Sequence, residues 1–226
     1  MKKILLISTG GTIASMPTDE GLTPKINSKK LLEYLNFTKL DFEIDTVNLL
    51  NVDSTDMQPE HWLKIKDEIK NNYEKYDGFV ITHGTDTMAY TASALSYLIQ
   101  NSQKPIVLTG SQKSIDMHIT DAKNNLLNSL LYASKSNSKG VSIVFDGKVI
   151  AGTRARKERT KSFDAFSSVN FPFLAIMQDE KIYRYINDEK CEKEVKFYDS
   201  LNTNVFVLKL IPSMTAKILP EIFKNY

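Results

Sequence analysis

The chain has 226 residues, of which 42% are hydrophobic and 25% charged, an ordinary composition for a folded domain and long enough to bury a substantial core. Its 29 basic and 27 acidic residues give a net charge of +2, so no field of one sign favours nucleic acid or an anionic membrane as a partner. No run approaches the ~18 apolar residues of a membrane span, and the single cysteine, Cys191, excludes an intrachain disulfide.

Strand and helix patterns alternate along the first two thirds of the chain. In chain order we expect a strand at residues 3–8, a helix at 29–35 capped by Ser28, a strand at 42–50, a helix opening at Gln58 and Pro59, a strand at 78–82, a helix at about 87–99, a strand at 105–109, a helix at 121–135 and a hairpin of strands 141–145 and 148–150. The first apolar run is too short for an export signal, so we interpret it as a buried strand. The turn Asp146-Gly147 is typical of a tight hairpin.

This alternation predicts an α/β fold, a Rossmann-like three-layer domain with a mostly parallel sheet, over residues 1–180. The polar stretch that follows, 181–203, is expected to be a linker. Residues 204–211 then have a strand pattern, and 215–223 a helix pattern that Pro220 disturbs. One strand and one helix cannot form an independent core, so residues 204–226 are predicted to begin a second, smaller α/β domain.

Polar segments rich in hydroxyl groups follow four of the predicted strands. They are residues 9–12 (TGGT), 53–56 (DSTD), 83–87 (HGTDT) and 110–112 (GSQ). Ligands of such sheets bind beyond the carboxyl ends of the strands, so the four segments together predict a small polar site. The glycine spacing matches neither the dinucleotide nor the phosphate-loop motif, and phosphate binding is not favoured.

Several residue types in these segments can carry chemistry, and each also has a structural interpretation. Thr12, beside two glycines, is either part of a plain turn or a nucleophile, which needs a group that takes its proton. Asp86 either caps a helix or holds an ammonium group. Residues 153–161 offer five basic side chains, from which spacing alone selects none as a base. His83 is expected to be structural.

Two motifs, TGGTIA at 9–14 and HGTDTM at 83–88, closely resemble the defining motifs of bacterial-type L-asparaginases. The match continues in the same order through DSTDM at 53–57, TGSQ at 109–112 and RTKSFDAF at 159–166, and it covers essentially the whole chain. It is similar above all to the cytoplasmic, type I branch. The resemblance implies a cytoplasmic enzyme that hydrolyses the side-chain amide of L-asparagine to L-aspartate and ammonia, with some glutaminase activity, without a metal or organic cofactor, and without nucleic acid or a membrane as partner.

The resemblance also implies the catalytic residues. Thr12 would be the nucleophile that attacks the side-chain amide carbon. Thr85, Asp86 and Lys161 would form a second triad, in which Lys161 helps to deprotonate Thr85 or an attacking water.

The binding residues follow from the same motifs. Asp86 and Ser54 would hold the α-amino and α-carboxylate groups of the substrate, with Asp53 and Thr55 lining the pocket. The backbone carbonyl of Ser111 would meet the side-chain amide.

Two features depart from the family pattern. Leu22 stands where many members carry a tyrosine in a lid, expected here at residues 15–21, that helps to activate the nucleophile. Members are also considerably longer: their C-terminal domain forms the homodimers and tetramers and donates polar residues to the neighbouring site. The alternative is therefore a folded, non-catalytic fragment that at most binds asparagine or aspartate. The asparaginase-like subunit of a transfer-RNA amidotransferase is disfavoured, because it would need an additional N-terminal domain before residue 9.

Overall fold

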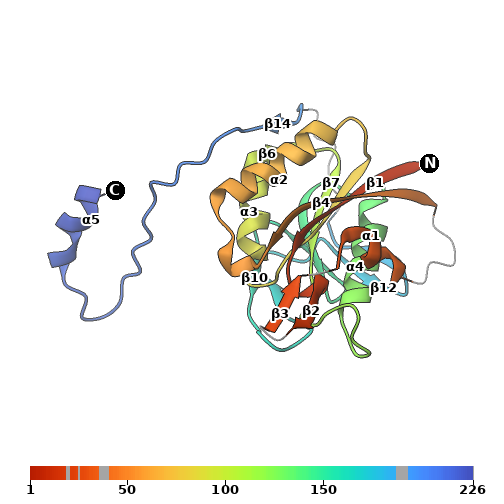
Figure 1. The fold of residues 1–226 in the computed structure, drawn as a ribbon. Coiled ribbons are helices and arrows are strands. Elements are labelled where there is room, and N and C mark those ends of the chain that lie inside the picture. Colours follow the sequence, from red (N-terminus) through yellow and green to blue (C-terminus); the bar gives the residue numbers. More distant parts are fainter. Residues whose placement is uncertain (19–20, 25, 36–40, 187–192, 226) are drawn as a thin grey trace.

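The computed structural model describes the backbone of residues 1–18, 21–24, 26–35, 41–186 and 193–225, and the side chains of these residues except 16–18, 21–24 and 225. Its elements in chain order are β1 (Lys2–Gly10), η1 (Thr12–Ala14), β2 (Ser15–Thr18), β3 (Gly21–Pro24), α1 (Ser28–Glu33), β4 (Phe42–Val52), η2 (Ser54–Asp56), α2 (Pro59–Asn72), β5 (Gly78–Thr82), α3 (Met88–Leu98), β6 (Ile99–Gln100), β7 (Pro105–Thr109), α4 (Ala122–Ala133), β8 (Gly140–Phe145), β9 (Lys148–Ala151), β10 (Ala155–Lys157), β11 (Phe166–Ser168), β12 (Ala175–Gln178), β13 (Lys181–Arg184), β14 (Lys196–Phe197), η3 (Ala216–Ile218) and α5 (Leu219–Asn225) (Figure 1).

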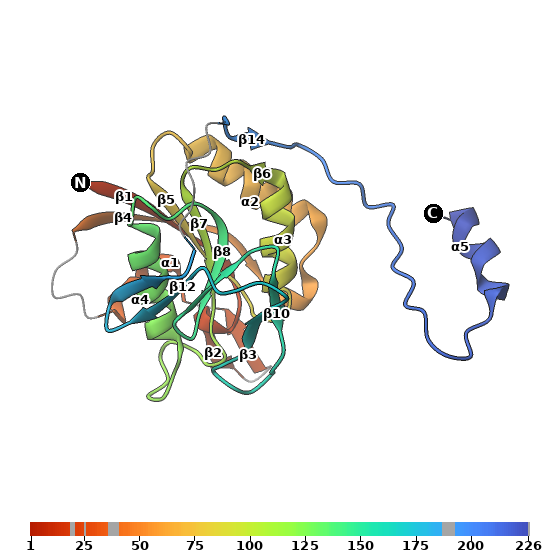
Figure 2. The same cartoon turned by 180° about the vertical axis from the view of Figure 1, so that it is seen from behind.

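An eight-stranded sheet forms the middle layer, in the order β13-β12-β9-β8-β7-β5-β1-β4. The five strands from β8 to β4 pair in parallel, and β9, β12 and β13 extend the sheet antiparallel. Helices cover both faces, with α1 and α4 on one side and α2 and α3 on the other (Figures 1 and 2). The predicted α/β fold with a mostly parallel sheet is confirmed.

Alternate residues of β1 supply the two halves of the core. Ile4 and Leu6 are fully buried in the cluster that includes Leu126 and Leu130 of α4. Ile7, on the opposite face, is buried in the cluster that α2 and α3 cover. A strand that must be apolar on both faces has a continuous apolar sequence, which is why this run was identifiable as a strand.

The cap of α1 differs from the expectation. The helix begins at Ser28, and the capping residue is Asn27, whose side chain accepts a hydrogen bond from the Lys30 amide at 2.8 Å. The Ser28 hydroxyl is buried and has no hydrogen-bond partner among the described residues. An asparagine caps a helix at least as well as serine, and here it lies one residue earlier, where its side chain reaches the amide three residues on.

Part of the expected linker belongs to the sheet. Lys181–Arg184 forms β13, an edge strand paired antiparallel with β12, and Ile182 packs against the core. Further on, β14 pairs with β6 at the end of α3. These strands are only four and two residues long and combine charged with apolar or aromatic residues, too short a pattern to stand out in a polar stretch.

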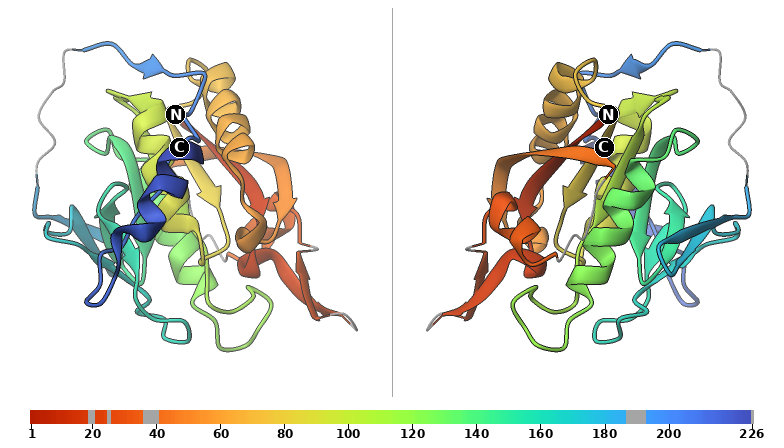
Figure 3. Two further views of the ribbon diagram at one scale, coloured as in Figure 1. Left: turned by 90° about the vertical axis from the view of Figure 1, so that its left-hand side faces the viewer. Right: turned by 90° about the vertical axis from the view of Figure 1, so that its right-hand side faces the viewer.

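The last part of the chain, residues 199–226, is called here the C-terminal arm. It leaves the body after β14 (Figure 3), and α5 lies apart from the sheet (Figures 1 and 2). The strand expected at 204–211 is wrong: these residues are extended, but the described chain supplies no strand to pair with them. The expected helix is present as η3 and α5, and Pro220 lies in the first turn of α5, where its missing amide costs nothing.

One buried lysine fastens the base of the arm. Lys66 of α2 is 1% exposed, and its ammonium donates to Asp199 at 2.8 Å and to Asp67 at 2.6 Å. Burial opposes the charge on Lys66, but the two carboxylates outweigh it and raise its pKa. In the described part of the chain, no helix is both long and apolar enough to cross a membrane.

Candidate functional site

Four loops meet where parallel strands end, and they touch through glycine backbones. A Cβ atom on Gly11 would lie 2.5 Å from the Gly84 Cα, and one on Gly84 would lie 2.5 Å from the Ser54 hydroxyl. A Cβ on Gly110 would collide with the carbonyl oxygen of His83. The loops after β1, β4, β5 and β7 therefore pack without room for a side chain between them, and the structure brings the four predicted segments together.

Thr12 begins the turn that follows β1. Gly10 and Gly11 have φ values of 103° and 80°, which favour glycine, and they turn the chain into the short helix η1. The Thr12 side chain is partly exposed, and within the described residues nothing hydrogen-bonds to its hydroxyl. Leu22 lies in β3, opposite Pro17 of the β2–β3 hairpin, and its side chain falls outside the described part of the chain.

A lysine joins the two polar residues after β5. The Lys157 ammonium donates to the Thr85 hydroxyl at 2.8 Å and to an Asp86 carboxylate oxygen at 2.6 Å. The Lys157 side chain is 13% exposed and that of Asp86 56%. Lys157 is the last residue of β10 and pairs with Phe166 of β11, whose ring packs 4.9 Å from that of Phe145. The lysine is thus held by a strand that is itself fixed to the core.

The expectation that Lys161 joins Thr85 and Asp86 is wrong, because the lysine that contacts them is Lys157. The amides of Glu158 and Arg159 both donate to the Ala165 carbonyl, so the chain reverses between them. Lys161 lies in this reversal, exposed and without a hydrogen bond or ion pair to any described residue. The sequence carried no signal that separates the two lysines, because residues 153–161 are polar and mostly charged throughout.

The segment after β4 contributes one buried and two exposed residues. Ser54 is 3% exposed and packs against Gly84, while its carbonyl accepts a hydrogen bond from Thr87 at 2.6 Å. Asp53 caps η2 by accepting from both the amide and the hydroxyl of Thr55 at 2.9 Å. Asp53 and Thr55 are therefore bonded to one another at the surface.

The segment after β7 reaches Thr85 through a residue that received no role from the sequence. The Thr85 hydroxyl donates to the Gln112 side-chain oxygen at 3.3 Å. The backbone amide of Gln112 donates to Asp121 at 2.9 Å. Burial raises the pKa of Asp121, and the hydrogen bonds that its carboxylate accepts, including this one, oppose that shift because they favour the charged form. Ser111 is fully buried and its hydroxyl donates to the Lys113 carbonyl, so this hydroxyl is used within the loop.

His83 belongs to a buried chain of hydrogen bonds behind the site. Its Nδ1 lies 2.7 Å from the Gly84 carbonyl, and its Nε2 lies 2.9 Å from the Thr91 hydroxyl, which also accepts from the Trp62 indole at 2.9 Å. A carbonyl can only accept, so Nδ1 carries a proton, and in the neutral ring Nε2 then accepts from Thr91. Burial lowers the pKa of His83 from 6.5 to about 4. The expected structural role of His83 fits these contacts.

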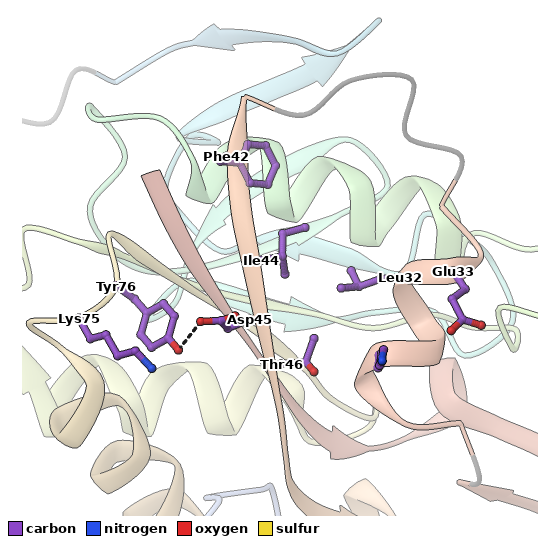
Figure 4. A pocket seen from close by; sticks show the side chains of 9 residues that line it. Leu32, Glu33, Phe42, Ile44, Asp45, Thr46, Lys75 and Tyr76 are labelled. Atoms are coloured by element: carbon purple, nitrogen blue, oxygen red, sulfur yellow. Dashed lines mark hydrogen bonds between the residues drawn. The ribbon is translucent and has the colours of Figure 1, made fainter. Parts of the chain in front are cut away.

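Two hollows lie near β4 and β10, and only the second borders this region. One of about 840 Å³ surrounds the first half of β4 and is lined by Phe42, Ile44 and Tyr76 among others, with the Tyr76 hydroxyl donating to Asp45 at 2.8 Å (Figure 4). It lies at the start of β4, whereas the site loops follow the end of this strand. The other, of about 570 Å³, is bordered by both Asp86 and Lys157. Among the described residues, no group of three or more His, Cys, Asp or Glu side chains could hold a metal ion.

Known proteins share this fold and part of this sequence. The family model described as "Asparaginase, N-terminal" matches residues 3–190. An L-asparaginase from Thermococcus kodakarensis is 37% identical over 96% of this chain and 66% of its own length. A solved structure of the thermostable L-asparaginase from that organism has a TM-score of 0.92 and 35% identity, covering 99% of this chain and 68% of that one. One component of the glutamyl-tRNA(Gln) amidotransferase from Sulfolobus acidocaldarius is 33% identical over 99% of this chain and 53% of its own length.

The chain therefore spans between about half and two thirds of the length of these curated relatives.

Proposed function

Because the chain belongs to the asparaginase family, we propose that it hydrolyses the side-chain amide of L-asparagine to L-aspartate and ammonia, with Thr12 as nucleophile. The observation that carries this proposal is the pair of hydrogen bonds from Lys157 to Thr85 and Asp86, at a sheet edge where the Gly11 and Gly84 backbones touch. A cytoplasmic location, favoured by the single cysteine, is part of the proposal.

In the first half of the reaction, the Thr12 hydroxyl attacks the side-chain carbonyl carbon. An ester bond forms to Thr12, the carbon–nitrogen bond breaks, and the proton from Thr12 leaves on ammonia. In the second half, a water adds to the ester carbon, the bond to Thr12 breaks, and L-aspartate is released while a proton from that water restores the Thr12 hydroxyl. Positioned acid–base groups typically accelerate such steps by roughly 10²–10⁴.

Lys157 supplies the base in place of the lysine expected from the sequence. Once it has lost its proton, its amine can take a proton from Thr85, or through Thr85 from the attacking water. Asp86 holds Lys157 by the 2.6 Å contact, and low exposure of the Lys157 side chain limits competition from bulk water.

Substrate recognition is assigned to the polar groups around Thr12. We assign the α-amino group to Asp86, the α-carboxylate to Ser54, and the side-chain amide to the Ser111 backbone carbonyl. Asp53 and Thr55, bonded to each other, line the entrance. L-glutamine is only one methylene longer and is discriminated weakly by such a pocket, so some glutaminase activity is part of the proposal.

The second candidate is a folded protein that binds L-asparagine or L-aspartate without turnover. It is favoured by the length of the chain, which spans 66% of the Thermococcus kodakarensis L-asparaginase. Residues donated from a neighbouring subunit, and the homodimers or tetramers that would bring them, depend in this family on the part beyond the match.

The test is ammonia release from L-asparagine and, in parallel, L-glutamine by the 226-residue chain. Thr12→Ala and Lys157→Met should each reduce turnover by at least about a hundredfold. Lys161→Met is the matched control, because this lysine belongs to the same segment but is exposed and contacts no member of the site.

Each outcome selects one interpretation. Turnover abolished by Thr12→Ala and Lys157→Met but kept in Lys161→Met supports the proposed enzyme. A larger loss in Lys161→Met than in Lys157→Met would refute the assignment of the base. A folded chain without turnover that binds L-aspartate in calorimetry would be the non-catalytic alternative.

A further inference from the structure

We propose that Gln112 is a positioning residue that fixes the Thr85 hydroxyl and ties it to the loop at residues 158–165, which follows Lys157. This inference rests on the proposed function, because it assigns the Thr85 hydroxyl a place in the reaction. It goes further because it names Gln112, which lies outside the group of Thr85, Asp86 and Lys157, as the residue that determines where the Thr85 proton points.

The orientation of the Gln112 amide follows from its neighbours. Its side-chain nitrogen lies 3.2 Å from the Arg159 carbonyl and 3.0 Å from the Ser162 carbonyl. Carbonyl oxygens only accept hydrogen bonds, so the NH₂ group must face the loop. The amide oxygen therefore faces Thr85, and at this 3.3 Å contact the threonine is the donor.

The hydroxyl of Thr85 has one proton, and this geometry determines where it points. The Lys157 ammonium donates to the Thr85 oxygen at 2.8 Å, so it cannot receive that proton. The proton points to Gln112, and one lone pair of the oxygen is taken by Lys157. The hydroxyl is thus fixed from both sides, which preserves its direction until Lys157 loses a proton.

The backbone of Gln112 is held as firmly as its side chain. Its amide donates to both carboxylate oxygens of Asp121, at 3.1 and 2.9 Å, and Asp121 is 7% exposed. Asn125, one turn along α4, donates to the Gly110 carbonyl at 3.0 Å. Gln112 is therefore a rigid connection between α4, the Thr85 hydroxyl and the 158–165 loop.

Two variants separate this role from simple space filling. Gln112→Met keeps nearly the same side-chain length and volume but removes the acceptor for Thr85 and both donors to the loop. Gln112→Glu keeps an acceptor for Thr85 but, when ionised, has no donor for the Arg159 and Ser162 carbonyls. Gln178→Met is the control, because Gln178 is exposed on β12, away from the site.

Kinetics give the first readout. In Gln112→Met we expect kcat for L-asparagine to fall about tenfold while KM stays within about twofold, because the lost hydrogen bonds orient a reacting group and do not hold the substrate. In Gln112→Glu we expect a similar loss at neutral pH. Relative to wild type at each pH, its activity should recover toward pH ~4.3, where protonation of the new carboxyl group restores one donor. Wild-type kinetics in Gln112→Met would overturn the proposal.

Amide hydrogen exchange gives a second readout that needs no turnover. The amides of Glu158 and Arg159 bond to the Ala165 carbonyl and close the loop that Gln112 holds. Their exchange should be at least about fivefold faster in Gln112→Met and in Gln112→Glu at neutral pH, and unchanged in Gln178→Met. Unchanged exchange in both Gln112 variants would overturn the connection to the loop, even if wild type proves inactive. Faster exchange in an inactive wild type would leave this connection standing and refute only the proposed enzyme.

Discussion

The strand-end loops are polar and closely packed, whereas the C-terminal arm is largely apolar and loosely packed. At the strand ends, a Cβ on Gly11 would lie 2.5 Å from the Gly84 Cα, and the hydroxyls and amides pair with neighbouring loops. In the arm, Val207 is 84% exposed and Leu210 is 79% exposed. The residues of the strand-end loops pack and hydrogen-bond with one another. The C-terminal arm carries apolar residues that nothing in the described chain covers.

The difference teaches that burial depends on partners that the fold brings together, not on the local pattern alone. The loops after β1, β4, β5 and β7 are distant in sequence, but the parallel strand order places them side by side. The arm has a strongly apolar segment, VFVLKLI, but the described part of the chain places no strand beside it. We propose that residues 204–226 begin a second, smaller domain.

The most severe disruption of the strand-end packing is expected from Gly11→Ala. The added Cβ would meet the backbone of Gly84, which cannot move aside, and the φ of 80° disfavours alanine. Strain of about 1–2 kcal/mol and overpacking of about 1–3 kcal/mol together predict a loss of about 4 kcal/mol in the free energy of unfolding. Urea unfolding measures it.

Gly140→Ala is the matched control. Gly140 also has a positive φ, of 62°, but a Cβ there would meet nothing within 4 Å. The loss in its free energy of unfolding should be only about 1 kcal/mol, because backbone strain is the only cost. Equal losses at the two positions would show that the loops are not in close contact.

The second-largest effect is a dependence of stability on pH that comes from His83. Burial lowers its folded-state pKa from 6.5 to about 4, so between these values the unfolded chain binds more protons than the folded one. The stabilisation is complete above pH ~6.5 and is lost as pH falls toward 4, by about 3 kcal/mol in total. Urea midpoints measured across this range test it.

The control for this effect is His83→Gln, which removes the titrating ring. Its free energy of unfolding will be lower at neutral pH, but the part of the slope between pH ~6.5 and 4 that belongs to His83 should disappear. An unchanged slope would mean that carboxylates elsewhere cause the acid sensitivity and that His83 is accessible to water.

Much of the fold was predictable because the central strands are buried on both faces. The runs that form β1, β5, β7 and β8 are continuous and apolar, and each appeared as a strand in the sequence. The short strands were not predictable. β10 and β11, for example, are three residues each, and what defines them is their pairing across an eight-residue loop.

The site was predictable to the extent that its residues follow strands directly. Thr12, Ser54, Thr85 and Asp86 do so, and their loops meet. Lys157 comes from the β10–β11 hairpin, whose register is a long-range property, so the sequence resemblance gave a lysine four residues too far along. The Gln112 contact with Thr85 likewise depends on the side-chain orientation set by two loop carbonyls.

A moderate effect is expected from Thr91→Val, which tests whether the hydrogen bonds behind the loops are as complete as they look. The change removes the donor to His83 Nε2 and the acceptor for the Trp62 indole, and it leaves both groups unpaired. We expect a loss of about 2 kcal/mol in the free energy of unfolding. Trp62 is the only tryptophan, so its emission should also shift to shorter wavelength as the indole loses its acceptor.

Thr82→Val is the companion to this change. The Thr82 hydroxyl is buried and unpaired within the described residues, so its replacement by an isosteric methyl group should be neutral or slightly stabilising. If both valine variants lost the same free energy of unfolding, the hydrogen bonds through Thr91 would contribute nothing to stability, because only the Thr91 hydroxyl has partners to lose.

The smallest effect on stability is expected where the packing is absent. Removal of residues 204–226 takes away Val205, Val207 and Leu210, which are 63%, 84% and 79% exposed, but leaves Lys66 bonded to Asp199 at 2.8 Å. Surface residues that bury nothing contribute less than about 0.5 kcal/mol, so the urea midpoint should hardly change. Binding of a hydrophobic dye should fall, because the largest exposed apolar segment is gone. A loss of more than about 1 kcal/mol would mean that the arm packs on the body, since only buried surface can supply that much.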